Sequence, residues 1–118
     1  MWGERPWDND QAADWLGGLM EKTSLPDKVR HTLRLANKGP DEETTPLLRA
    51  AAWCLIQLGH IYVWPVSELE DDLKLAIHAL ELVLQDEEYC YNEAIITKIK
   101  EEQKTLQERL DLICNKAS

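Results

Sequence analysis

Three aspartates near the start of the chain, Asp8, Asp10 and Asp14, have a spacing that suggests a metal site. Carboxylates at alternate positions are what a calcium-binding loop of the EF-hand type supplies. That loop also needs glycine at its sixth position and glutamate at its twelfth, where this chain has Ala13 and Leu19. We therefore interpret the aspartates as a helix cap and as first-turn acids that complement the helix dipole.

Histidine and cysteine form no recognisable zinc pattern. Their spacings match no ligand pair, and the HExxH motif is absent. His78 and Glu81 are three residues apart, but the di-iron motif of helical bundles places glutamate first and needs a second copy. The sequence predicts no metal and no cofactor. The residues considered are His31, His60, His78, Cys54, Cys90 and Cys114.

A nucleophilic enzyme needs a serine or cysteine within reach of a base. Cys54 lies in an apolar segment, where we expect it to pack as a small hydrophobic side chain. Cys90 lies among acids, which raise the pKa of a thiol and oppose thiolate formation. No glycine-rich phosphate loop is present. The sequence therefore offers no catalytic residue and argues against an enzyme, with acids brought together by folding left as an alternative.

An aromatic arrangement is the best candidate for binding. Arg49, Trp53 and Gln57 follow one another at four-residue spacing, so they share one face of a helix, and arginine there can stack on the indole. The pair would form a binding anchor, because tryptophan and arginine dominate interface hot spots. Alternatively, an N-terminal arm with Trp2 and Trp7 covers this face, and we favour this second interpretation.

Acidity is the main feature of the composition. The formal net charge is -9, which disfavours nucleic acid and anionic membranes, since both are bound through Lys and Arg. Between Glu68 and Glu93, nine acids stand against Lys74 alone. Such a band is either a solvated helix face or a surface that binds a basic partner.

The pattern of breaks and apolar residues predicts about five helices. All glycines and prolines fall at or before Pro65, so the second half favours long helices. We expect caps at Asn9 or Asp8, at Ser24, at Thr45, and at Ser67, which opens the capping-box sequence SELE. The expected helices cover residues 10–22, 24 to about 36, 45 to about 64, 67–84 and 92–114. Whether residues 85–92 separate the last two, or one long bent helix runs through, is left open.

Packing expectations follow from the same pattern. The third helix is apolar nearly all the way round, which predicts a central and buried position. The fourth carries two apolar stripes, so it either packs on more than one neighbour or forms an oligomer contact. Gly17 and Gly18 weaken the first helix by roughly 1 kcal/mol each, and close packing on a neighbour would explain them.

The predicted fold class is all-α, a compact single-domain bundle over residues 1–118. Residues 1–9 form an N-terminal aromatic clasp, 10–115 the helices and 116–118 a tail. Three cysteines without a CxxC pair indicate a reducing compartment, and the opening MWGERPWDND has neither the basic nor the apolar part of a signal peptide. We expect a cytoplasmic protein.

The stretch WGERPWDNDQAADW, residues 2–15, resembles the opening of a bacterial family of small proteins, domain-of-unknown-function family 4259. That family typically begins W-G-x-G-P-F-x-N-D-x-A-x-D-F. Trp7 and Trp15 stand where the family has phenylalanine, and Arg5 replaces its second glycine. The segment AAAWCLIQLGH is a weaker match to an alanine-rich helix. Direct matches are Trp2, Gly3, Pro6, Asn9, Asp10, Ala12 and Asp14.

The resemblance implies a small helical domain without an assigned activity. It supports a folding clasp in which Trp2 and Trp7 dock on the bundle, Gly3 and Pro6 set a turn, and Asn9 or Asp10 caps the first helix. Such a clasp predicts that Trp7→Ala lowers stability by about 3–5 kcal/mol. The residues assigned to the clasp are Trp2, Gly3, Pro6, Trp7, Asn9, Asp10, Asp14 and Trp15.

The leading functional hypothesis is a non-enzymatic interaction module, such as an immunity-type inhibitor that masks a basic surface. One alternative is a small-ligand or catalytic domain with a pocket between the third and fourth helices, near His60 and His78. Another is a homo-oligomeric scaffold joined through the second stripe of the fourth helix. The candidate partner-binding residues are Glu70, Asp71, Asp72, Glu81, Asp86, Glu87, Glu88, Arg49 and Trp53.

Overall fold

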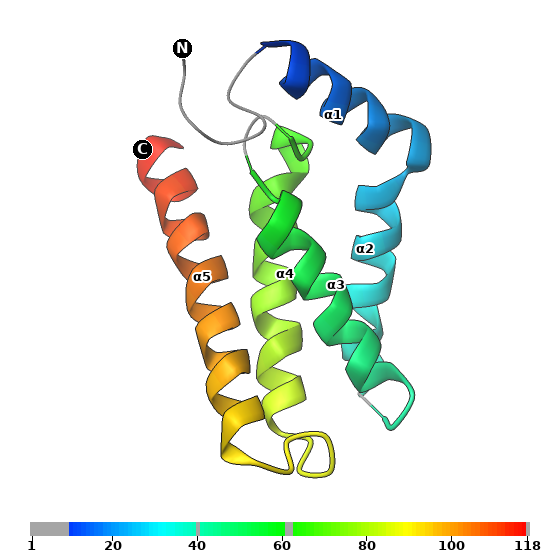
Figure 1. Ribbon diagram of the computed structural model, residues 1–118, viewed down its shortest axis with the longest axis vertical. Helices are drawn as coiled ribbons and strands as arrows, with labels where there is room; N and C mark the ends of the chain where they lie inside the picture. Colours follow the sequence, from blue (N-terminus) through cyan, green and yellow to red (C-terminus); the bar gives the residue numbers. More distant parts are fainter. Residues whose placement is uncertain (1–9, 40, 61–62, 118) are drawn as a thin grey trace.

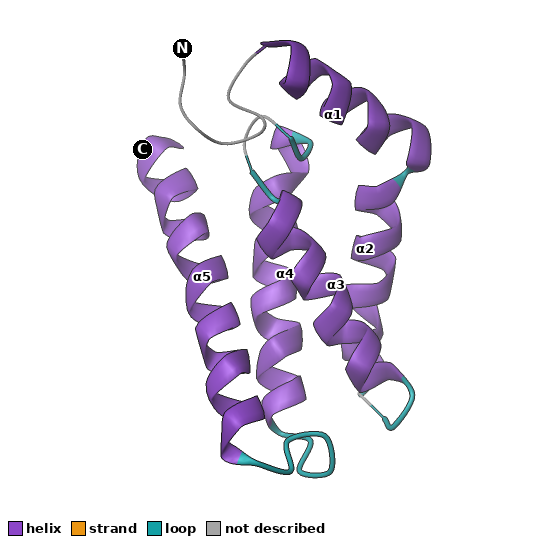
Figure 2. Ribbon diagram, in the orientation of Figure 1, coloured by secondary structure: helices purple, strands orange, loops and turns teal. Residues whose placement is uncertain are grey.

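The computed structural model describes residues 10–39, 41–60 and 63–117, and these form an all-α bundle (Figures 1 and 2). No strand occurs within those ranges. The elements are α1 (Asp10–Thr23), α2 (Leu25–Leu33), the 3-10 turn η1 (Arg34–Lys38), α3 (Thr44–Leu58), α4 (Val66–Leu84) and α5 (Glu93–Ala117). The predicted all-α class is therefore confirmed. The clasp residues of segment 1–9, Trp2, Gly3, Pro6, Trp7 and Asn9, lie outside the described part of the chain.

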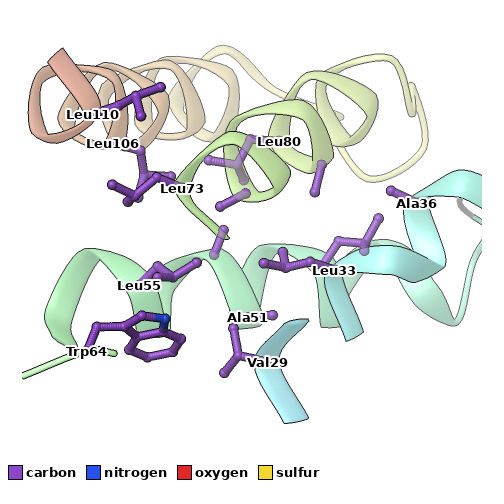
Figure 3. Close-up of a cluster of buried hydrophobic side chains, with 14 of the residues drawn as sticks. Val29, Leu33, Ala36, Ala51, Leu55, Trp64, Leu73, Leu80, Leu106 and Leu110 are labelled. Carbon is purple, nitrogen blue, oxygen red and sulfur yellow. The ribbon is translucent and has the colours of Figure 1, made fainter. Parts of the chain in front are cut away.

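Helix α4 occupies the centre of the bundle. It packs against α2, η1, α3 and α5, which confirms that its two apolar stripes serve more than one neighbour. Leu73 and Leu80 lie between the side chains of α5 and those of α3, with Leu55 and Leu106 on either side (Figure 3). These four side chains are fully buried. The core therefore extends along both faces of α4.

Helix α3 is less buried than its composition predicts. Leu48, Ala52 and Leu55 face the core, but Leu47 and Trp53 are exposed. The helix packs on α2, α4 and α5, which leaves one side to solvent. The predicted central and buried position therefore holds for one side of α3 only, with Leu47 and Trp53 on the side that faces solvent.

The chain leaves α3 earlier than expected. The helix ends at Leu58, so His60, Val63 and Trp64 do not belong to it. The chain needs glycine at position 59, because a Cβ there would lie only 2.5 Å from the carbonyl oxygen of Leu55. Trp64, which follows, is buried in the core.

The capping predictions were partly wrong. Ser24 lies in the left-handed region at φ 53° and makes no side-chain cap bond, while α4 begins at Val66 without one. Asp41, in place of Thr45, caps α3, since its Oδ1 accepts the backbone N–H groups of Glu43 and Thr44 at 2.9 Å each. Short polar side chains compete for such positions, and spacing alone does not choose between them.

The start of α5 settles the question left open at residues 85–92. The side chain of Asn92 accepts the backbone N–H of Ile95 at 2.9 Å, as a helix cap does. Glu93 begins the helix, and residues 85–92 form a connection between α4 and α5. The two helices are separate.

Two expectations for α1 were wrong. Among the described residues, a Cβ built at Gly17 or Gly18 meets nothing within 4 Å, so close packing against this part of the chain does not explain the two glycines. Trp15, assigned to the clasp, is 67% exposed, and Asp14 is exposed too. Helix α1 contacts only α2 among the described elements, and this arrangement leaves much of its surface to solvent.

Candidate functional site

Acidic side chains from two separate connections meet at one end of the bundle. Figure 1 shows that the connection before α3 and the connection between α4 and α5 lie at the same end. They line a shared hollow of about 530 Å³ together with Leu82 and Gln85. We call its carboxylates the acidic pole: Asp41, Glu42, Asp86, Glu87 and Glu88.

Two of these carboxylates, Asp41 and Asp86, stabilise the conformation of the connections through hydrogen bonds. Asp86 Oδ1 accepts the backbone N–H groups of Glu88 and Tyr89 at 3.1 Å each. Its Oδ2 accepts the hydroxyl of Thr45 at 2.8 Å, and this bond joins the connection to the start of α3. Asp41 is fixed by the α3 cap. The pole is therefore built on ordered backbone.

The same bonds favour the charged form of both aspartates. The backbone N–H of Thr44 makes the largest contribution to lowering the pKa of Asp41. The Thr45 hydroxyl makes the largest contribution to lowering the pKa of Asp86. Hydrogen bonds donated to a carboxylate stabilise its ionised form. Within the described ranges, the pole carboxylates make no ion pair with a base.

The pole gathers carboxylates at the surface without the close grouping of a metal centre among the described residues. No group of three or more His, Cys, Asp or Glu side chains among the described residues is arranged to hold a metal ion. Glu42, Glu87 and Glu88 are exposed. They are free to reach lysine or arginine side chains that approach this end.

The acidic band of α4 does not form one continuous face. Asp72 was predicted at the surface but is fully buried, because it pairs with Arg30 of α2. Glu70 Oε1 accepts the thiol of Cys114 at 3.1 Å. Asp71 and Glu81 are exposed, as expected. The structure thus divides the predicted band and brings only its 86–88 portion to the pole.

Arg49 and Trp53 do not act as a stacked pair on the surface. Arg49 makes two hydrogen bonds to Glu102 of α5, at 3.0 and 2.8 Å, and a third to the hydroxyl of Tyr89 at 3.3 Å. These bonds raise its pKa above the ordinary value, with Glu102 the largest cause. Trp53 is 54% exposed on α3. The arginine therefore joins α3 to α5 and is a structural residue.

The histidines do not meet in a pocket between α3 and α4. His78 lines a hollow formed with α5 residues Gln103 and Leu110. His60 lies beyond the end of α3. Buried side chains of α3 and α4, Leu55 and Leu73 among them, pack together in the core, and the pocket expected near His60 stays a prediction.

The three thiols have raised pKa values. Burial raises the pKa of Cys54 and, with a smaller contribution from Asp86, that of Cys90. The hydrogen bond to Glu70 is the largest cause for Cys114. The predicted direction for Cys90 is confirmed, although burial outweighs charge as its cause. None of the three is an activated nucleophile.

Sequence reasoning missed Asp41 and Glu42, although it selected Asp86, Glu87 and Glu88. A run of acids in the sequence indicates only neighbours along the chain, and Asp41 and Glu42 lie more than forty residues before Asp86. The order of the predicted helices could have indicated that these acids lie close together. Alternate connections of an up-and-down helical bundle lie at the same end, so acids in the 39–43 and 85–92 connections meet.

No family model, curated protein or solved structure matches the chain. Among the described helices, none combines the length and apolar character needed to cross a membrane. The site must therefore be interpreted from its own geometry.

Proposed function

We propose that this protein is a non-enzymatic interaction module that binds a basic partner through the acidic pole. The observation that carries the proposal is the convergence of five carboxylates from two connections on one hollow of about 530 Å³. A surface of one sign attracts a partner of opposite charge and accelerates its association. A cytoplasmic bacterial inhibitor of a basic protein, of the immunity type, is consistent with this arrangement.

The alternatives have less support. The stripe of α4 proposed for self-association, Leu75, Ala79 and Leu82, packs within the bundle, with Ala79 buried and the two leucines half-buried. None of the hollows described here lies between α3 and α4, so the ligand pocket expected there has no supporting observation among the described residues. The raised thiol pKa values oppose cysteine catalysis. A binding function is the one that the described geometry favours.

The test compares two variants with equal charge but different location. One reverses the pole, Glu42→Lys/Glu87→Lys/Glu88→Lys; the other reverses three exposed acids of α5, Glu101→Lys/Glu108→Lys/Asp111→Lys. Tagged protein is used to isolate partners from its own cell lysate at low and high salt, and the association rate of the purified partner is then measured. We expect the pole variant alone to lose a stoichiometric basic partner that dissociates at high salt. Equal losses for both variants would show that net charge, and not the pole, determines binding.

A further inference from the structure

A second hollow lies at the other end of the molecule, between α1, the start of α2 and the start of α4. Its volume is about 540 Å³, within the usual range for sites that hold small organic molecules. Met20, Trp64 and Pro65 contribute its apolar floor, and Val66, which is 67% exposed, adds an apolar wall open to solvent. We call this hollow the α1–α4 groove. It shares no lining residue with the acidic pole, so binding at the groove does not depend on the proposed function.

The charges around the α1–α4 groove do not balance. Glu21, Asp27 and Glu68 line it, and none of the other described lining residues is a lysine or an arginine. Arg30 lies behind them with a side chain that is only 14% exposed. It donates to Glu68 at 2.7 Å and to Asp27 at 2.9 Å, and two further bonds, both of 2.7 Å, go to the buried Asp72. One guanidinium is thus shared among three carboxylates.

That sharing leaves negative charge directed at the groove. Arg30 and Asp72 neutralise each other, because they meet through two parallel bonds of 2.7 Å. Asp27 and Glu68 each use one oxygen for Arg30 and retain the other. Their side chains are 72% and 43% exposed, so a cation in the groove can reach both. Glu21 adds a third uncompensated charge.

The glycines of α1 keep the space open. Gly17 lines the groove, and a Cβ there would meet nothing within 4 Å. Glycine inside a helix is unfavourable relative to alanine, so a position without a packing neighbour has no structural need for it. Gly18, next in the chain, does not line the groove. A larger side chain at residue 17, but not at residue 18, would occupy the groove.

We propose that the α1–α4 groove binds a small organic cation, an apolar body that carries a protonated amine. The amine lies against the free oxygens of Glu68 and Asp27. The apolar body lies against Val66 and Pro65, above the floor that Met20 and Trp64 form. Partial exclusion of water by the apolar lining strengthens the charge contacts relative to those at an open surface.

The test uses two probes of nearly the same shape, 4-phenylbutylamine and the neutral 4-phenylbutan-1-ol. Each is titrated into the ¹⁵N-labelled protein and followed by NMR. We expect saturable shifts at Gly17 and Val66 and at the indole N–H of Trp64, which donates to Asp72 at 2.8 Å beside the groove. The amine should bind at least about tenfold more tightly than the alcohol, as expected for a charge contact at partial exposure.

Two pairs of variants identify the cause of binding. Glu68→Gln should weaken the amine about tenfold and leave the alcohol unchanged, whereas Glu108→Gln, on the exposed face of α5, should change neither. Gly17→Leu should abolish binding of both probes, whereas Gly18→Leu should retain it. Equal affinity for amine and alcohol would overturn recognition of the cation. Absence of saturable shifts, or equal effects of the two leucine variants, would overturn the site.

Discussion

Arg30 and Asp72 form a two-point ion pair across the interface of α2 and α4. Arg30 Nε lies 2.7 Å from Asp72 Oδ1, and Nη2 lies 2.7 Å from Oδ2. Trp64 Nε1 donates to the same Oδ2 at 2.8 Å, so one fully buried carboxylate joins three segments of the chain. The bond to Asp72 is the largest cause that raises the pKa of Arg30 above its ordinary value. The arginine is therefore charged across the accessible pH range.

Removal of this carboxylate should strongly destabilise the fold. Asp72→Ala leaves the guanidinium of Arg30 largely buried without its main partner and leaves the Trp64 N–H without an acceptor. Breaking one side of a buried pair typically costs about 3–5 kcal/mol, and we expect a loss in that range in urea unfolding. Asp71→Ala, one residue away and exposed, is the matched control and should change stability by no more than about 0.5 kcal/mol. Similar losses in both variants would show that the pair is not a major source of stability.

Arg109 of α5 should contribute to stability through the end of α3. Its Nη1 donates to the carbonyl oxygens of Leu55 and Ile56 at 2.7 and 2.9 Å, and burial lowers its pKa. Arg109→Met removes both bonds; the Leu55 carbonyl keeps the backbone N–H of Gly59, but the Ile56 carbonyl loses its donor and the end of α3 loses a cation, so we expect a loss of about 2–4 kcal/mol. Lys104→Met, on the exposed side of α5, serves as control. The measurement is the midpoint of chemical unfolding, and a loss no greater than that of the control would contradict the role assigned to Arg109.

The acidic pole should make stability depend on pH. Hydrogen bonds lower the pKa of Asp41 and Asp86 in the folded chain, so each group binds more protons when the chain is unfolded. Each therefore adds stability above its unfolded pKa, about 3.9, and loses it as the pH falls through the lower folded value. The difference in Tm between the wild type and Asp41→Asn/Asp86→Asn should shrink as the pH falls from about 5 to 3. A difference that is constant with pH would refute this linkage.

A second pair of substitutions controls for the loss of charge itself. Glu42→Gln/Glu87→Gln removes two charges from the same pole at residues for which the described structure shows no side-chain hydrogen bond. Their Tm difference from the wild type should show less dependence on pH. Equal dependence in both double variants would attribute the effect to repulsion within the pole.

The cysteines should react slowly in the native protein. Raised pKa values at Cys54, Cys90 and Cys114 reduce the thiolate fraction at neutral pH. We expect iodoacetamide at pH 7.5 to label all three more slowly than in the urea-unfolded chain, as followed by mass spectrometry. Glu70→Gln should selectively accelerate labelling of Cys114, because the hydrogen bond to Glu70 is the largest cause of its raised pKa. Native labelling at the unfolded rate would contradict the prediction.

Local sequence patterns predicted a helix correctly where an apolar repeat was strong and uninterrupted. The apolar repeat of α4, with Leu73 and Leu80, correctly indicated a helix with several neighbours, and Asn92 caps α5 in a region whose break was uncertain. Contacts between distant residues were not predictable from such patterns. Asp71 and Asp72 are adjacent and have the same sequence neighbours. Only Asp72 faces Arg30, which lies 42 residues earlier in the chain.

The candidate sites show the same limit. Glu87 and Glu88 were selected from a run of charge, while Asp41 and Glu42 needed the arrangement of the connections. The α1–α4 groove could not be anticipated, since it depends on three segments that meet only in the fold. Gly17 was noted for its helix cost, but the reason assigned to it was wrong because the space beside it is open.

Among the described elements α1 packs only on α2, and this has a consequence for hydrogen exchange. An element that packs on one neighbour can open without unfolding the rest, and its amides then exchange through a sub-global opening. The amides of α4, which packs on α2, α3 and α5, can exchange only when the bundle opens as a whole. Helix α1 therefore forms a low-stability cooperative unit, and a ligand that bridges it to the start of α4 would slow its exchange while leaving that of α5 unchanged.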